Sequence, residues 1–523
     1  MRFQTLVRSI SSTAGGGALL IAAFSVVSKL LGFLRDRLIA GHFGASRIAD
    51  IYFASFRIPD FIFNILVLGA LTSAFIPIFQ KTWNSDRRAG IELSNSILNI
   101  LLLVIGVLAA LLVVLAPQVM PLIVPGFQPS EMALTVTMTR IMLVSLLFFT
   151  ASNVLSGVLN AWHKFFTFAV SSAVYNVGII FGIVLLYPIF GIYGLSFGVV
   201  LGSALHFGVQ LAESLVRGWR YAPVIRISAA AKRIFVLMIP RAIGLAASQI
   251  NQTIILILAS ALPAGHLAIF MYADNLRSFP IGIFGISLAV ATFPSFSQTL
   301  AANDLTRFRT IFSRRFRQII FFLIPISFTI LLLRAHIVRV VLGSGSFDWN
   351  ATLLTAQTLG YFAIAISAQG LIPLMARAFY AAEDTRTPVI ISISGMCITI
   401  GLALFLVRYF GLIGLAIADA SANLLMMLAF FIFLHAKLGD LNDHEIARAV
   451  RRILSISLVS AAIVHFTLQA TDVLLASRTF VGVLLHGTVA GSAGIITYLT
   501  LALLLNFDEA AVIRNFLRRA FRT

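Results

Sequence analysis

The residues best placed to do chemistry in this sequence are charged side chains inside long apolar stretches. Lys29, Arg35 and Asp36 lie in the first stretch, and Arg57 lies in the second. An ionisable group inside a bilayer costs about 2.5–3.5 kcal/mol on insertion scales, so each is a functional candidate by default. On a helix Lys29, Gly32 and Asp36 share one face. Asp36 balances one neighbouring cation, and the net positive interior that remains favours an anion.

Pyrophosphate is the anion class that suits such a site, because guanidinium groups bind phosphate oxygens through a bidentate fork. Later stretches add two candidate cations, Arg241 and Arg277. For any single arginine the alternative is a helix-end side chain that reaches toward the interface. We favour that alternative for three others, Arg140, Arg334 and Arg339.

Residues near these cations have candidate gating or structural roles. They are Asp50, Pro59, Asp274 and Pro280. A proline inside a helix frees a carbonyl group and can kink the helix, so a hinge and a packing role both remain open. The polar run 248–252 is expected to be interhelical glue or cavity lining. Asp419 is a lone acid for which interhelical hydrogen bonding is favoured over cation coupling.

The elements that carry these residues must be membrane helices. The chain has 523 residues, of which 59% are hydrophobic and only 11% charged, and its mean hydropathy is +1.00. Soluble domains carry roughly 25% charged residues. Transmembrane β-strands alternate polar and apolar residues over about ten positions, whereas residues 97–115 are continuously apolar. The sequence therefore predicts an all-α polytopic membrane protein.

Apolar stretches of the length needed to cross a bilayer, about 20 residues, recur along the whole chain. We expect fourteen transmembrane helices, at 17–41, 50–80, 92–117, 131–161, 168–188, 193–216, 234–262, 267–300, 319–342, 351–381, 389–408, 412–436, 453–470 and 480–505.

An internal repeat relates the two halves at an offset of 220 residues. Tyr52 and Arg57 match Tyr272 and Arg277, and Gly191 matches Gly411. Each unit holds six spans, so the repeat is parallel, as in some transporters. We expect an N-lobe at 1–222, a C-lobe at 223–438 and two extra helices at 439–523. Two such lobes suggest a central cavity and alternating access, although duplication can also build a larger bundle.

The basic residues set the orientation. The net charge is +19, and the gaps between apolar stretches alternate between rich and poor in lysine and arginine. The positive-inside rule places the rich gaps, and both termini, in the cytoplasm. This distribution argues against nucleic acid as a partner and favours anionic membrane lipids. The first apolar block could pass for a signal peptide, but we expect it to be an uncleaved span.

Signatures of enzymes and cofactors are missing from the sequence. It contains no GxxxxGK[ST], HExxH or GxSxG motif, and its single cysteine, Cys397, permits neither an intrachain disulfide nor a cysteine metal site. We therefore predict no catalysis, no cofactor and no metal. Transport would be driven by a gradient, by the membrane potential or by a partner.

Several motifs together resemble the MurJ (MviN) family of lipid II flippases. Residues 28–36, SKLLGFLRD, are similar to the family's SRxLGFxRD. Residues 42–50, 56–59 and 74–77 resemble its FGA…D, F[KR][LI]P and AFVP motifs, and 272–285 and 384–388 resemble YAD…FPxGxxG and D[TI]KTP. The matches run in order from residue 17 to about 425.

This resemblance implies a fold of the multidrug/oligosaccharidyl-lipid/polysaccharide exporter superfamily and a lipid II flippase in the bacterial inner membrane, acting in peptidoglycan synthesis. Cavity arginines would bind the lipid's pyrophosphate, and the last two helices would form a groove for its tail. Arg35 and Asp36 fall on family functional positions, and Lys29 replaces the usual arginine. The alternative is an exporter of another polyprenyl-linked saccharide. We expect a monomer.

The sequence departs from the family at two places. Phe63-Asn64 and Asn275 stand where the family often has arginine. Asn275 stays a candidate binding residue because of its position. We hypothesise that Arg57, Arg241 and Arg277 restore the missing charge.

Overall fold

The computed structural model describes residues 14–162, 164–472, 479–511 and 514. Over these ranges the chain forms helices, turns and loops and contains no β-strand, so the predicted all-α fold is confirmed. Ten described helices are long and apolar enough to cross a membrane. The segments outside these ten, α2, α3–α5 and α12, include those with the candidate cations Lys29, Arg35, Arg57 and Arg241.

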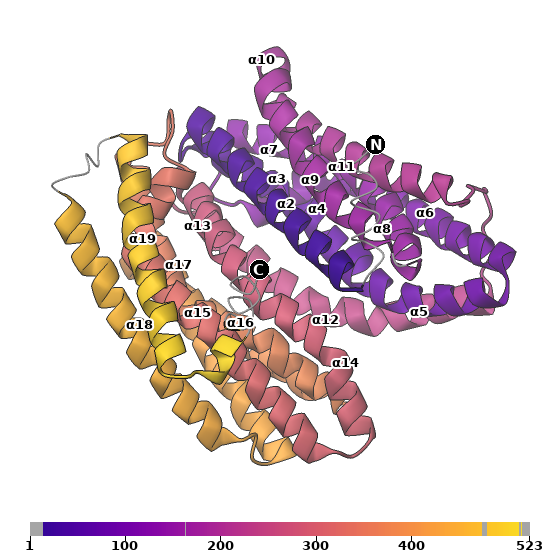
Figure 1. Ribbon diagram of the computed structural model, residues 1–523. Helices are drawn as coiled ribbons and strands as arrows, with labels where there is room; N and C mark the ends of the chain where they lie inside the picture. The colour runs from indigo at the N-terminus through magenta and orange to yellow at the C-terminus, as the bar shows by residue number, and fades with distance from the viewer. Residues whose placement is uncertain (1–13, 163, 473–478, 512–513, 515–523) are drawn as a thin grey trace, which may run out of the picture. The chain divides into compact units, whose positions relative to one another are not determined.

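The chain divides by packing into two compact units, which we describe separately (Figure 1). Unit 1 comprises Met1–Ala268 with Ser344–Ser346. Its helices are α2 (Ala14–Phe43), α3 (Arg47–Ser55), α4 (Arg57–Ile62), η1 (Phe63–Gly69), α5 (Ala70–Ser85), α6 (Arg87–Ile123), α7 (Pro129–Leu143), α8 (Ser145–Ala161), α9 (Phe165–Phe181), η2 (Gly182–Leu186), α10 (Tyr187–Phe190), α11 (Tyr193–Val216) and α12 (Ala229–Ser260).

Unit 2 comprises Ile269–Gly343 and Phe347–Thr523. Its helices are α13 (His266–Pro280), which begins in unit 1, η3 (Ile281–Ile286), α14 (Ser287–Ala301), α15 (Leu305–Val341), α16 (Trp349–Ala381), α17 (Arg386–Leu438), α18 (Asp443–Asp472), α19 (Phe480–Leu504) and η4 (Asp508–Ala510). The described helices are consistent with fourteen spans when α3–α5, α7–α8, α9–α10 and α13–α14 are each taken as one broken helix and α17 as two.

The packing boundary differs from the boundary of the predicted repeat. Helix α12 packs against α5, η1 and α6, so unit 1 continues past residue 222. Helices α18 and α19 pack on α15 and belong to unit 2. The division at 222 and 438 therefore describes the sequence repeat, for which it remains a prediction.

Several helices begin at side chains that accept from free backbone N–H groups, as expected for N-cap residues. Asp86 accepts from the backbone of Arg88, and Asp348 accepts from that of Ala351. Ser228, Asp304 and Thr479 do the same for α12, α15 and α19. These caps place the polar ends of the helices without the help of tertiary contacts.

Pro59 accounts for the break between α3 and α4. Without an N–H, it cannot bond the carbonyl of Ser55, four residues before it. That carbonyl instead accepts from the Thr139 hydroxyl on α7, at 3.4 Å. The break lies at Phe56, three residues before Pro59, and Arg57 begins α4. Pro59 therefore helps to set where the candidate cation is presented.

Two glycines related by the predicted offset turn the chain in the same way. Gly191 follows α10 with φ 58° and ψ −145°, and Gly411 interrupts α17 with φ 54° and ψ −130°. Three residues later, Gly194 and Gly414 lie against the backbones of Leu186 and Leu406, where a Cβ would be within 2.4 Å of backbone atoms. The matching geometry supports a duplicated fold and makes α17 two spans.

Replacing Gly411 by alanine is expected to destabilise the protein by about 1–3 kcal/mol, because its positive φ strains any L side chain. No atom lies within 4 Å of the added Cβ, so a clash would not explain the loss. Gly401→Ala is the matched control: it lies in the regular part of α17, also in open space. Apparent melting temperatures in detergent should fall for Gly411→Ala and hold or rise for Gly401→Ala, and equal values would contradict the strain.

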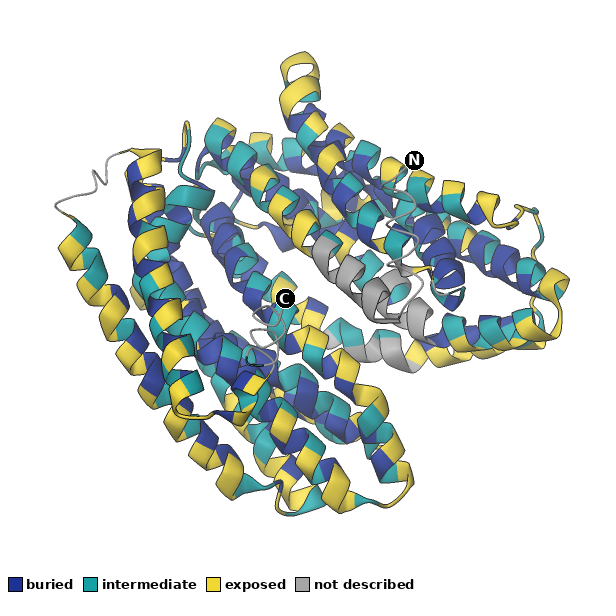
Figure 2. Ribbon diagram, viewed as in Figure 1, coloured by how far each residue is buried: buried dark blue, intermediate teal, exposed yellow. Residues whose placement is uncertain are grey.

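Each unit has its own apolar core. In unit 1, residues of α5, α6, α8 and α12 such as Phe75, Phe79 and Val154 are fully buried. In unit 2 the core includes Phe296 of α14 and four phenylalanines of α15: Phe308, Phe312, Phe316 and Phe321. Exposed residues follow the outer faces of α18 and α19 (Figure 2), and many are large and apolar, including Phe466 and Ile496. Such faces are expected where lipid replaces water as the solvent.

Candidate anion-binding site

Arg35 forms the first cluster of the site, on α2. Its Nε and Nη2 atoms donate to Oδ1 of Asp36 at 2.9 and 2.8 Å, and Nη1 donates to Oδ1 of Asn176 at 3.3 Å. Asn176, on α9, also donates to the Ser28 carbonyl at 3.3 Å. The Arg35 side chain keeps 21% of its surface exposed. The guanidinium is thus held in place, and part of the side chain stays accessible.

Arg57 forms the second cluster, in which α12 supplies every hydrogen-bond partner. Its Nε atom donates to Thr253 Oγ1 at 2.9 Å and Nη1 to Gln252 Oε1 at 3.2 Å. Its Nη2 atom donates to the Gln249 carbonyl at 3.0 Å and to Gln249 Oε1 at 2.6 Å. Four of the five guanidinium N–H groups are thereby used. All these partners are neutral, so the positive charge is hydrogen-bonded but not neutralised by them.

A cavity of about 440 Å³ lies beside Arg57 within unit 1. Except for Arg57 and Thr253 its lining is apolar, and it is formed by α4, η1 and α6 through residues such as Phe61, Leu66 and Leu112. One cation at the wall of an apolar space matches a ligand with a charged group attached to a hydrocarbon part.

Asp60 links the two clusters electrostatically. Its carboxylate acts on both Arg57 and Arg35, and its side chain is exposed. None of the described ion pairs joins Asp60 to either arginine. Arg35 and Arg57 are therefore both close enough to Asp60 to interact with its charge. An anion of higher charge could bind the two arginines more strongly than Asp60 does.

Asp50 has a structural role at the start of α13. Fully buried, it accepts from the backbone N–H groups of Gly265 at 2.7 Å and Ala268 at 2.8 Å. Arg47 approaches the same carboxylate at 3.4 Å. A negative charge at a helix N-terminus is favoured by the helix dipole, so Asp50 fixes where α13 begins.

Arg277 lies in unit 2 and is surrounded by acids. It pairs with Asp419 on α17 and, at 2.6 Å, with Asp274. Gln369 donates to the same Asp419 carboxylate at 3.3 Å, and the guanidinium carbon lies 3.6 Å from the centre of the Phe362 ring. Asp419 thus makes interhelical contacts of the kind expected from the sequence.

The two repeat-related arginines are equally buried but differently neutralised. Arg57 and Arg277 each expose 7% of their surface, and each precedes a π-helical segment, η1 and η3. Neutral amide and hydroxyl oxygens hold Arg57, whereas two carboxylates hold Arg277. Only the unit 1 copy keeps a charge that an incoming anion could use.

The other candidate residues are distributed as follows. Lys29 is exposed on α2, seven residues before Asp36. Asn275 is half-buried on α13, and Pro280 ends that helix just before η3. Arg241 lies on α12, but its side chain is outside the described residues. Among the described residues, no cluster of three or more histidine, cysteine or acidic side chains could hold a metal ion.

Sequence reasoning did not identify Asn176 or the pairing of Arg277 with Asp419. Asn176 is 141 residues from Arg35, and Asp419 is 142 residues from Arg277. No local spacing reports such contacts. The polar run 248–252 was a usable signal, and its members Gln249 and Gln252 bind Arg57.

The motif at 384–388 connects the start of α17 with its end. Asp384 accepts from Lys437 Nζ at 2.7 Å and from the Thr387 backbone and hydroxyl at 3.0 and 2.7 Å. Partial desolvation acts to raise the pKa of this loop carboxyl, but the Lys437 and Thr387 donors outweigh it and hold the pKa below its usual range. Asp384 therefore stays ionised and ties the two ends of α17 together.

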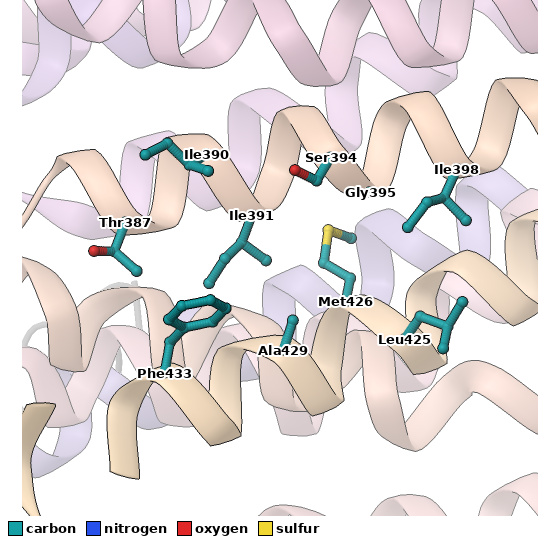
Figure 3. A pocket seen from close by; sticks show the side chains of 10 residues that line it. All are labelled: Thr387, Ile390, Ile391, Ser394, Gly395, Ile398, Leu425, Met426, Ala429 and Phe433. Carbon is teal, nitrogen blue, oxygen red and sulfur yellow. The ribbon is translucent and has the colours of Figure 1, made fainter. Parts of the chain in front are cut away.

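A second, apolar cavity of about 230 Å³ lies between the two halves of α17. Met426 and Phe433 approach from one half, and Ile391 and Gly395 lie opposite them on the other (Figure 3). No charged side chain lines it. It lacks the cation that a phosphate would need, so the candidate anion site remains the one in unit 1.

Comparison with known proteins shows which family the chain resembles. The sequence model of the lipid II flippase MurJ family matches residues 39–485. The probable lipid II flippase MurJ of Rhizobium tropici is 28% identical over 513 residues, covering 94% of each chain. The lipid II flippase MurJ of Burkholderia cenocepacia is 27% identical over 393 residues, covering 73% of this chain and 76% of that one.

Solved structures agree on the fold. A lipid II flippase MurJ in an inward closed conformation superposes with a TM-score of 0.77 at 23% identity, covering 95% of this chain and all of that one. An inward-facing multidrug resistance MATE transporter of the MOP superfamily gives 0.69 at 14% identity, covering 82% and 99%. The resemblance seen in the sequence motifs is thereby confirmed. The family match spans most of the chain, and the protein is therefore a member of the lipid II flippase MurJ family.

Proposed function

We propose that this protein moves lipid II, the undecaprenyl-pyrophosphate-linked peptidoglycan precursor, from the cytoplasmic to the outer leaflet by alternating access. The observation that carries the proposal is Arg57, a buried guanidinium with only neutral hydrogen-bond partners beside an apolar cavity. The Arg57 guanidinium could bind the pyrophosphate, and the apolar wall of the cavity could bind the polyprenyl chain. Family membership supports the same substrate.

In this mechanism the pyrophosphate binds Arg57, which has no carboxylate partner among the described residues, and Arg35, which keeps its ion pair with Asp36. The doubly charged headgroup gains charge-assisted hydrogen bonds, which are roughly twice as strong as neutral ones. Asp36 and Asn176 orient Arg35, and Gln249 and Thr253 orient Arg57, so little side-chain entropy is lost on binding. The substrate would leave when the change of access exposes this site to the other leaflet.

The setting that we propose follows from the family and from the charge asymmetry. The protein would be a monomer in the bacterial inner membrane, with both termini cytoplasmic and its basic loops against anionic lipid. It would be a transporter without catalytic activity, cofactor or nucleic-acid partner.

Complementation tests the proposal directly. Expressed in bacteria depleted of their own flippase, the chain is expected to restore growth and to restore lipid II that a membrane-impermeant reagent can reach from outside. Normal expression with no accessible lipid II would contradict the proposed substrate.

An exporter of another polyprenyl-linked saccharide is the second candidate. It is favoured by the departures at the site: Phe63 packs its ring 5.0 Å from that of Phe149, and Asn64 donates to the Asp60 carbonyl at 2.8 Å. Neither offers a cation where the family often has one. Under this alternative, cells would fail complementation but accumulate a different saccharide when the protein is lost.

A further inference from the structure

A second charged cavity lies at the arginine-rich end of unit 2 and shares no lining residue with the cavity beside Arg57. It has a volume of about 360 Å³ and is formed by residues 310–317 of α15, residues 445–452 of α18 and residues 507–509. The charge asymmetry assigns this side to the cytoplasm. Its charged lining comprises Arg314, Arg317, Glu445, Arg448, Arg452, Asp508 and Glu509.

The acids of this cavity gather around one arginine. Arg317 approaches Glu509 at 2.9 Å, Asp508 at 3.6 Å and Glu445 at 3.7 Å. The Glu509 side chain is only 7% exposed, whereas those of Asp508 and Glu445 are 86% and 56% exposed and therefore well solvated. Arg317 is thus the cation that pairs with these acids, and it lies closest to the buried Glu509.

The other three arginines have no carboxylate partner among the described residues. Arg452 donates to the Leu505 carbonyl at 2.6 Å and stacks over the Phe507 ring at 4.4 Å, and both groups are neutral. Arg314 and Arg448 are exposed and line the same cavity. The three acids and Arg317 together carry a net charge of −2, and the other three arginines carry +3. The cavity lining therefore has a net positive charge, and these three arginines form its cationic side.

Apolar surface adjoins this cationic side. Leu504 and Leu505, at the end of α19, expose 71% and 50% of their surface, and the carbonyl of Leu505 is the one that binds Arg452. Basic pockets between membrane helices on the cytoplasmic side bind anionic lipid headgroups. A soluble phosphate would use the arginines but not the leucines.

We propose that this cavity binds the phosphate headgroup of an anionic phospholipid of the arginine-rich leaflet, with Arg314, Arg448 and Arg452 on the phosphate and the acyl chains along the end of α19. The site is separate from Arg35 and Arg57, and the proposal holds whichever saccharide the protein carries. It makes the docking of α18 and α19 on α15 sensitive to the lipid composition of the membrane.

Titration of the purified full chain in uncharged detergent tests this proposal, with native mass spectrometry and thermal shift as readouts. Short-chain phosphatidylglycerol is expected to bind and to raise the melting temperature, while short-chain phosphatidylcholine does neither. The double variant Arg314→Gln/Arg448→Gln should bind phosphatidylglycerol roughly thirtyfold more weakly, since each cation near an anionic lipid contributes about a factor of five.

Arg307→Gln/Arg451→Gln is the matched control. It removes the same charge from the same two helices, at exposed positions outside the cavity, and should retain most of the binding. Equal losses in the two double variants, or no preference for phosphatidylglycerol, would overturn the site. Inorganic pyrophosphate forms a third arm: if it saturates the cavity as well as the lipid does, the ligand is a free phosphate and the assignment to lipid is wrong.

Discussion

Cells that depend on the Arg57→Ala variant are expected to stop growing and to lose lipid II from the outer surface. The substitution removes a buried cation that lines the cavity of unit 1 and whose hydrogen-bond partners, among the described residues, are all neutral. Charge-assisted hydrogen bonds contribute about 1.5–3 kcal/mol, so the flipping rate should fall roughly tenfold to hundredfold. Growth rescue and extracellular access to lipid II measure the loss.

Two further variants separate charge from folding. Arg57→Lys keeps the charge but not the planar fork and should give an intermediate rate. Arg140→Ala removes another half-buried membrane arginine, which donates to the Val113 carbonyl at 2.8 Å and does not line the cavity beside Arg57. This variant should leave flipping intact. Membrane abundance is measured for all three. Normal flipping by an abundant Arg57→Ala protein would rule out Arg57 as the substrate cation.

The Arg277→Met variant is expected to be the least stable single substitution in unit 2. It leaves the Asp419 carboxylate, whose side chain is 10% exposed, without its cation. Removing one partner of a buried ion pair costs about 3–5 kcal/mol, which corresponds to a fall of roughly 10 °C in melting temperature for a unit of this size. A thermal melt of the purified protein in detergent measures the fall.

A second substitution shows whether the stranded charge is the cause. The double variant Arg277→Met/Asp419→Leu should regain most of the stability, because replacing a whole buried pair by apolar groups is often neutral or better. Asp274→Asn is a milder control, since the Asp274 side chain is 35% exposed and Arg277 keeps Asp419. If Arg277→Met melts with the unchanged protein, the pair does not stabilise unit 2.

The fold was predictable because its signals are local. Apolar stretches long enough to cross a membrane predict the helices, and a proline or glycine indicates several of the helix breaks. The sequence offset alone pairs Gly191 with Gly411, and the two glycines share one backbone conformation. Residue spacing also placed charged groups inside helices correctly, since the burial of Arg57 and Arg277 follows from the apolar residues around them.

The partners of those charges were less predictable, because they are set by packing between distant helices. The sequence places an acid three residues from each repeat-related arginine, Asp60 after Arg57 and Asp274 before Arg277. Only the second forms a described ion pair. The order of the residues differs, because the acid follows Arg57 but precedes Arg277. The remaining partners come from distant helices: α12 brings amides to Arg57, and α17 brings a carboxylate to Arg277.

The unequal surroundings of Arg57 and Arg277 have an evolutionary consequence. After a duplication, both copies of a residue begin with the same task, and the usual route to specialisation is to mutate one of them. Under the proposed duplication, the arginine is the same in both copies and its neighbours differ: carboxylates pair with Arg277, and neutral groups bind Arg57. Selection for a new cargo would then act first on α12, whose amides can be exchanged without giving up the inherited arginine.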